Sequence, residues 1–198
     1  GGRNTEKENA YEGFDISLSR GFKFFEVDIF LDIDGNLNCS HDEPKSATFC
    51  NLEDLLRKVH AEKSYLIIDI KSDFHKTFNL IAKRAEFREG PMWSSLIMQI
   101  YKPEELYYYS NAPAHKKFFN PPIISTYKSN RKISDTCKEL MNTGIDTIAL
   151  STRKARFQHG ACEEFNIIIH PVQTCAEIVE LKNISGIFTN SEEKSCQI

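Results

Sequence analysis

Short apolar strands alternate with helical segments along the whole 198-residue chain, and this alternation strongly limits how it can fold. The predicted strands are 24–31, 65–70, 95–101, 122–126, 147–151, 166–169 and 186–189. The predicted helices are 8–20, 52–60, 74–88, 103–109, 134–143 and 175–182, with 154–165 either a helix or a loop. Such alternation is typical of a parallel sheet covered by helices. Seven strands without a phosphate-binding glycine loop favour an α/β fold of the (β/α)8 TIM-barrel type that lacks its first strand.

The composition describes an ordinary globular protein, with 40% hydrophobic and 27% charged residues. The length suits one domain, so we expect residues 1–198 to form a single barrel domain. A net charge of -3 provides no basic surface for nucleic acid, so no nucleic-acid partner is expected. No apolar run reaches the roughly 18 residues that a membrane span needs, so we expect no transmembrane segment. The sequence leaves the oligomeric state open.

The first predicted strand carries two acidic residues inside an apolar run. Side chains in a strand alternate between its faces, so Glu26 and Asp28 share one face, roughly 7 Å apart. Two neighbouring acids in a core are costly unless a cation or a proton donor offsets their charge. A solvated strand with incidental charges is the alternative.

A hairpin is predicted to follow this strand, because Asp34-Gly35 is a strong turn signal. A two-residue loop would pair Ile33 with Asn36, and Asp28 would then face His41. We therefore expect Glu26, Asp28 and His41 to form one acid–imidazole cluster. A register change of one residue would send His41 to the other face.

The next strand also ends in a carboxylate, Asp69, followed two residues later by Lys71. In a barrel the carboxyl ends of the strands meet at one mouth, where function is found. Three carboxylates without nearby thiolate ligands favour a hard cation, Mg²⁺ or Ca²⁺, and Lys71 adds a group that can hold a phosphate. His41 supplies a proton donor or acceptor, and together these groups suit metal-assisted phosphodiester cleavage. A simple strand-end ion pair between Asp69 and Lys71 is the alternative.

Two further features are less specific. His170 follows an apolar strand, where it could line the substrate pocket at the mouth. The six cysteines lack zinc-finger spacing, and we expect them to be mostly reduced, as in an intracellular protein. The expected compartment is therefore the cytoplasm, although the even number of cysteines allows a secreted protein, and Cys39 with Cys50 could close the loop that carries His41.

The sequence resembles the glycerophosphodiester phosphodiesterase family over nearly its whole length, more weakly in its middle third. The matching motifs are Gly1-Gly2, the segment 8–14, Glu26-Val27-Asp28, Asp34-Gly35, His41-Asp42, Asp69-Ile70-Lys71 and the segment 186–190. The resemblance implies a TIM barrel that cleaves a small glycerol- or lipid-type phosphodiester with Mg²⁺ or Ca²⁺. It implies that Glu26, Asp28 and Asp69 are metal ligands, that His41 is an acid/base histidine, and that Lys71 contacts the phosphate.

Three departures from the family pattern keep alternatives open. The family's first catalytic histidine precedes its Gly-Gly pair, so it would lie upstream of Gly1, and a chain that truly began there would have an open barrel and little activity. Asp69 replaces the commoner glutamate, as in the related sphingomyelinase D-like enzymes, which form a cyclic phosphate. The segment 170–173 also differs, which affects the expected substrate preference. A non-catalytic barrel that binds metal and phosphate is a further alternative, and a sugar-processing barrel is disfavoured because its two acids should face each other across the substrate.

Overall fold

The computed structural model describes residues 11–43, 52–87, 90–111, 119–126, 132–141, 143–157, 162–172, 174–178, 181 and 184–189. The chain divides into two compact units, Gly1–Asn120 and Pro121–Ile198. Both units combine strands with helices. Within the described ranges, no helix combines the length and apolar character that crossing a membrane requires.

The first unit contains a sheet with the strand order β2-β1-β3-β4. Its strands are β1 (Phe24–Leu31), β2 (Leu37–Cys39), β3 (Tyr65–Ile70) and β4 (Leu96–Ile100). Strands β1, β3 and β4 are parallel, whereas β2 is antiparallel to β1. The helices are α1 (Tyr11–Ser19), α2 (Leu52–Ala61), α3 (Phe74–Phe87), the 3-10 helix η1 (Pro91–Ser95) and α4 (Pro103–Asn111).

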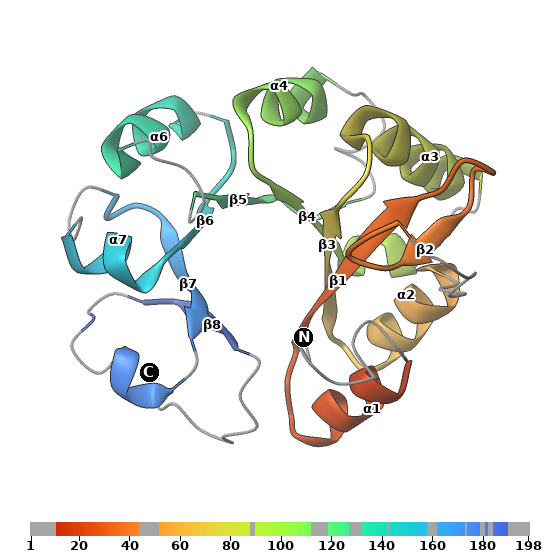
Figure 1. Ribbon diagram of the computed structural model, residues 1–198, viewed down its shortest axis with the longest axis horizontal. Helices are drawn as coiled ribbons and strands as arrows, with labels where there is room; N and C mark the ends of the chain where they lie inside the picture. The colour runs from red at the N-terminus through yellow and green to blue at the C-terminus, as the bar shows by residue number, and fades with distance from the viewer. Residues whose placement is uncertain are drawn as a thin grey trace. The chain divides into compact units, whose positions relative to one another are not determined.

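The core of this unit follows from its apolar pattern. Three consecutive residues of β3, Leu66, Ile67 and Ile68, are almost completely buried, as expected for a parallel strand covered on both faces. Helix α2 buries the stripe formed by Leu52, Leu55, Leu56 and Val59. Figure 1 shows α2 and α3 lying beside β1 and β3. The sequence pattern did not predict η1, whose Trp93 is completely buried.

The second unit contains four parallel strands in the order β5-β6-β7-β8. They are β5 (Ile123–Ser125), β6 (Thr147–Leu150), β7 (Asn166–Val172) and β8 (Gly186–Thr189). The helices are α6 (Ile133–Leu140), α7 (Thr152–Phe157) and the 3-10 helix η2 (Cys175–Glu177). With the three parallel strands of the first unit, the described residues therefore contain the seven parallel strands that the sequence predicts.

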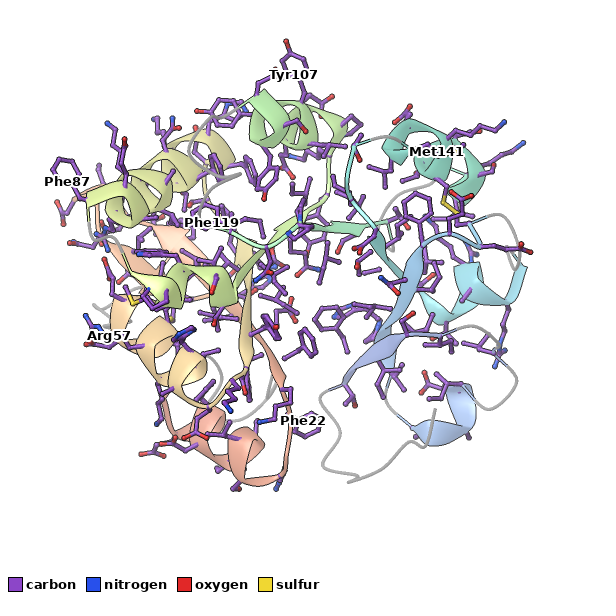
Figure 2. The ribbon with its side chains drawn as sticks, turned by 180° about the vertical axis from the view of Figure 1, so that it is seen from behind. Phe22, Arg57, Phe87, Tyr107, Phe119 and Met141 are labelled. Carbon is purple, nitrogen blue, oxygen red and sulfur yellow. A yellow bond between two sulfur atoms is a disulfide. The ribbon has the colours of Figure 1, made fainter. Side chains whose placement is uncertain are left out.

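Some predicted elements differ from the structure. The predicted helix 175–182 is wrong over its first residues, which form the single 3-10 turn η2. The ambiguous segment 154–165 contains the helix α7, which begins two residues earlier. Strand β7 extends to Val172, so His170 lies inside the strand rather than beyond it. At the surface, Phe87 and Tyr107 point away from their helices (Figure 2) and are 87% and 74% exposed.

The predicted register of the β1–β2 hairpin is wrong by one residue. Leu31 pairs with Leu37, whereas a two-residue loop would pair Leu31 with Asn38. The whole of β2 is therefore shifted by one residue relative to the predicted pairing. The Asn36 N–H donates to Asp32 Oδ1 over 2.8 Å, and Asp32 N–H donates to the Asn36 carbonyl over 3.0 Å. Gly35 has φ 84°, so a left-handed glycine completes a three-residue loop. The side chain of Asp32 thus favours the longer turn, and β2 ends two residues before His41.

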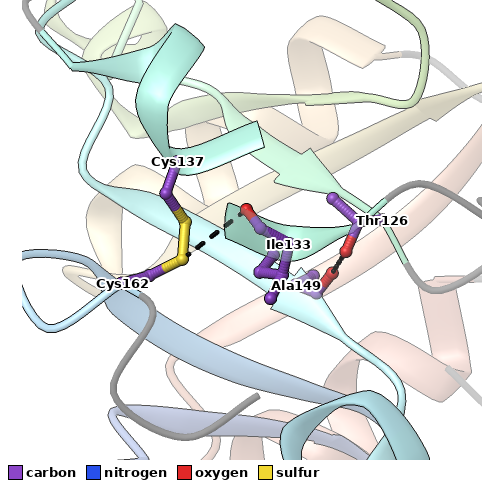
Figure 3. The surroundings of a disulfide bond; sticks show 5 residues. All are labelled: Thr126, Ile133, Cys137, Ala149 and Cys162. Carbon is purple, nitrogen blue, oxygen red and sulfur yellow. Dashed lines mark hydrogen bonds between the residues drawn. A yellow bond between two sulfur atoms is a disulfide. The ribbon is translucent and has the colours of Figure 1, made fainter. Parts of the chain in front are cut away.

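The expectation that the cysteines are reduced is also wrong. A disulfide joins Cys137 of α6 to Cys162, in the turn before β7 (Figure 3). Cys39 is disulfide-bonded as well, whereas Cys50 lies outside the described residues. The cytoplasmic expectation rested on reduced thiols and loses that basis, because disulfides persist mainly in oxidising compartments.

Candidate metal and phosphate site

The register of the first unit places its acidic residues side by side. Asp28 of β1 pairs with Asp69 of β3, and Asp69 pairs with Gln99 of β4. Partners on neighbouring strands project to the same face, and Glu26 shares that face because it lies two residues before Asp28. Three adjacent strands therefore direct polar side chains to one side of the sheet.

The three predicted ligands do converge. Glu26, Asp28 and Asp69 each offer a carboxylate oxygen, and these oxygens all lie within 4.8 Å of one another. Glu26 and Asp28 are half-buried, whereas Asp69 is only 1% exposed. The sequence-based prediction that these acids form one cluster is confirmed.

Lys71 joins the same cluster. Its Nζ lies 3.1 Å from Asp28 Oδ1 and also donates to Asp69 Oδ2. Burial alone would lower the pKa of Lys71, but its hydrogen bond to Asp69 and the charges of Asp69 and Asp28 together raise it. The ammonium therefore stays charged and links the carboxylates of two strands. The alternative of a simple ion pair between Asp69 and Lys71 does not include the second contact, with Asp28.

The unfavourable burial and repulsion of the carboxylates affect Glu26 in particular. Burial, followed by the negative charges of Asp69 and Asp28, raises the pKa of Glu26 from 4.5 to about 7, although Lys71 acts in the opposite direction. One ammonium does not neutralise three carboxylates, so without another cation Glu26 holds a proton up to nearly neutral pH.

The donor atoms of this cluster fit a hard divalent cation. All three ligand groups are carboxylates, and oxygen ligands suit Mg²⁺ and Ca²⁺. Asp69 Oδ1 is buried and has no hydrogen-bond partner among the described residues. A buried carboxylate oxygen without a partner is costly, and a bound cation would remove that cost.

Sequence reasoning missed Tyr101, which directly follows β4. Its hydroxyl donates to Asp69 Oδ2, and Lys71 Nζ lies 6.0 Å from the centre of its ring. Tyr101 comes two residues after Gln99, the strand partner of Asp69, so an alignment of β3 with β4 could have identified it. The sequence contains no local motif that marks this tyrosine.

The two predicted histidines contact other residues. His41 belongs to the segment after β2, and its side chain is 49% exposed. Its Nδ1 lies 3.0 Å from Asp42 Oδ1, a contact that favours a proton on Nδ1 and leaves Nε2 as the second proton-exchanging atom. His170 lies on β7 in the second unit, edge-on to Phe188 at 5.3 Å between ring centres. The roles of His41 in catalysis and of His170 in substrate binding stay predictions.

Solved structures match nearly the whole chain. A candidate glycerophosphoryl diester phosphodiesterase from Silicibacter pomeroyi matches with TM-score 0.74 and 13% identity, covering 98% of this chain and 88% of its own. An Oleispira antarctica phosphodiesterase, solved with its product sn-glycerol-3-phosphate, matches with TM-score 0.65 and 10% identity over 90% and 85% of the two chains. A glycerophosphoryl diester phosphodiesterase from Parabacteroides distasonis matches with TM-score 0.64 and 13% identity over 92% and 77%.

The chain has the glycerophosphodiester phosphodiesterase fold. This is the TIM-barrel type of α/β fold expected from the sequence, and the described residues contain one parallel strand fewer than the eight of a complete barrel. No protein-family model and no curated protein matches the sequence. The fold assignment therefore rests on the structural matches. The sequence resembles the family only in single residues and short segments.

Proposed function

We propose that this protein is a divalent-metal-dependent phosphodiesterase that cleaves a glycerophosphodiester or a related lipid-type phosphodiester. The observation that carries the proposal is the cluster of Glu26, Asp28 and Asp69, with their oxygens within 4.8 Å and Lys71 beside them. The fold supports it, because the solved structures with this fold include phosphodiesterases. One of these was solved with sn-glycerol-3-phosphate, which supports a small phosphodiester as the substrate here.

The three carboxylates would hold the metal ion, Mg²⁺ or Ca²⁺. When bound, such an ion supplies Lewis-acid stabilisation of phosphoryl oxygens and lowers the pKa of an attached water or hydroxyl group. Lys71 has the charge and the fixed position to bind a phosphate oxygen, since it is anchored on Asp28 and Asp69. These residues therefore bind and orient the phosphate and offset its charge.

His41, in its doubly protonated form, would donate a proton to the oxygen of the departing alcohol. An imidazole has an ordinary pKa near neutrality, which suits general acid–base catalysis. Its contact with Asp42 orients the ring and keeps a proton on Nδ1. Nε2 is then the nitrogen that gains and loses the transferred proton. Its partial exposure allows exchange with solvent between turnovers.

Replacement of single ligands tests the proposal. At a metal concentration of about 100 times Kd, the wild-type protein should gain about 2.7 kcal/mol of stability, measured as a rise in Tm. Asp28→Asn should abolish both this stabilisation and the turnover of a glycerophosphodiester, whereas His41→Ala should abolish turnover and keep the stabilisation. Turnover should be measured on the polypeptide with any residues that its gene encodes ahead of Gly1.

Asp15→Asn is the matched control, because Asp15 is an exposed aspartate of α1 that pairs with Lys58. It should leave metal stabilisation and turnover unchanged. Metal stabilisation without turnover would instead identify a binding protein. Wild-type protein that is not stabilised by millimolar Mg²⁺ or Ca²⁺ would show that the carboxylate cluster is no metal site.

A further inference from the structure

The two carboxylate oxygens of Asp69 have different surroundings. Oδ2 accepts hydrogen bonds from Lys71 Nζ and from the hydroxyl of Tyr101, whereas Oδ1 is buried and has no hydrogen-bond partner among the residues that the structure covers. Two donors on one oxygen restrict rotation of the carboxylate. The arrangement leaves Oδ1 as the oxygen available to a cation.

We propose that Tyr101 is a positioning residue for the metal site: its hydroxyl holds Asp69 so that Oδ1 is presented to the bound ion. This inference rests on the proposed function, because it assumes that the carboxylate cluster binds a metal. Residues that hydrogen-bond a metal ligand fix its orientation, and their loss commonly lowers metal affinity by about 10- to 100-fold. Tyr101 has no charge in this role, which separates its contribution from that of Lys71.

The backbone of Tyr101 is itself held in place. Glu105 of α4 accepts the backbone N–H of Tyr101 over 3.0 Å and that of Lys102 over 3.2 Å through its Oε2. A glutamate at the third position of a helix commonly caps the preceding chain in this way. The helix start is thereby connected to the side chain of Asp69 through the ring and hydroxyl of Tyr101.

The choice of metal offers a specific test of positioning. Mg²⁺ demands nearly ideal octahedral geometry, whereas Ca²⁺ accepts a variable number of ligands in a flexible arrangement. A carboxylate that loses one of its two donors can reorient, and this should affect Mg²⁺ more strongly. Tyr101→Phe removes only the hydroxyl, so it should lower Mg²⁺ affinity about 10-fold and Ca²⁺ affinity about 2- to 3-fold.

The experiment is calorimetric titration of the metal-free 198-residue chain with Mg²⁺ and with Ca²⁺. Tyr108→Phe is the matched control, because the hydroxyl of Tyr108 donates to Asn79 Oδ1 over 2.6 Å on the α3–α4 side of the unit. This control loses a comparable hydrogen bond and should keep both affinities. The Tm of each metal-free variant shows whether folding is intact.

The outcomes separate this inference from the proposed function. Wild-type protein that binds neither metal overturns both. If wild-type protein binds metal and Tyr101→Phe binds equally well or more tightly, only the role of Tyr101 is overturned, because the hydroxyl then does not help or even competes with the ion. Equal losses for both metals, or equal losses in Tyr108→Phe, would show a general structural effect and also overturn it.

Discussion

The two units differ in the polar groups that lie on or next to their strands. In the first unit, Glu26, Asp28, Asp69 and Lys71 lie together, and burial raises the pKa of Glu26. In the second unit, the groups at the ends of β5 and β6 are mainly neutral hydroxyls: Thr126 Oγ1 donates to the Ala149 carbonyl over 3.3 Å (Figure 3). The first arrangement has an uncompensated charge, whereas the hydroxyl of Thr126 is neutral and has a backbone acceptor within the protein.

The difference bears on the proposal that the first unit carries the chemistry. Perturbed titratable groups are concentrated at functional sites, because stability alone favours neutral or paired groups in a core. The second unit also contains a perturbed group, because burial and the neighbouring charge of Arg153 lower the pKa of Lys154, but its Nζ donates to the neutral carbonyl of Thr126. Among the described residues, the group of three acids that could hold a metal ion lies in the first unit, and three perturbations can test this comparison.

Removal of the disulfide should have the largest effect on stability. The Cys137–Cys162 bridge spans a sequence separation of 25, and closing a loop of that size contributes about 3 kcal/mol. The double variant Cys137→Ser/Cys162→Ser should lose about that amount in a denaturant titration. Hydrogen exchange should accelerate in α6 and β6, while β1, β3 and the metal affinity stay unchanged.

Wild-type protein in the same assay is the reference, and Thr143→Ser, a conservative change on the loop after α6, controls for surface substitution. Faster exchange in β1 and β3 of the double variant would contradict the division between the units. It would show that the bridge supports the carboxylate cluster as well.

The pH dependence of the metal-free protein should show the second-largest effect. Because the pKa of Glu26 is higher in the folded protein than its ordinary value of 4.5, the folded state binds the proton more tightly. Stability from this group is therefore present below pH 4.5 and is lost as the pH rises towards about 7. Relative to Glu26→Gln, which cannot ionise, the wild-type protein should lose about 2 kcal/mol between about pH 5 and about pH 7.

Saturating Mg²⁺ should reverse this trend, since a bound cation favours the ionised carboxylate. Glu12→Gln is the control, because Glu12 is an exposed glutamate of α1, and its pH profile should follow that of the wild type. Parallel profiles of wild type and Glu26→Gln would show that Glu26 does not carry the cost of the cluster.

Much of the fold could be predicted because continuous apolar runs define strands without reference to distant residues. Strands β3 and β8 have the predicted bounds, since each is a short, mostly apolar run with clear limits. Strand β3 lies between Ser64 and Lys71, and β8 begins at Gly186. The acidic cluster could be predicted for a similar reason: side-chain alternation is a local property, and parallel pairing brings Asp28 beside Asp69.

The remaining features depend on contacts that no local pattern records. The loop of the hairpin is one residue longer than predicted because the Asp32 side chain bonds to Asn36, and this altered the expected place of His41. Tyr101 could not be recognised without the pairing of β3 with β4. The partner of Cys137 depends on how α6 packs against the turn before β7, so sequence spacing alone did not reveal the disulfide.

The smallest expected effect is at Glu105, the residue that holds the backbone of Tyr101. Glu105→Ala removes the acceptor of two backbone N–H groups at the start of α4, and loss of such a cap should lower the free energy of unfolding by about 1 kcal/mol. The Mg²⁺ affinity should also fall by about 2-fold, less than in Tyr101→Phe, because the hydroxyl contact with Asp69 is weakened indirectly rather than removed. Glu104→Ala, the exposed neighbour in the same helical turn, should change stability by less than about 0.5 kcal/mol and leave the affinity unchanged. If Glu105→Ala lowers stability but not Mg²⁺ affinity, Tyr101 keeps its position without this cap, and the connection from α4 to the metal site ends at the helix.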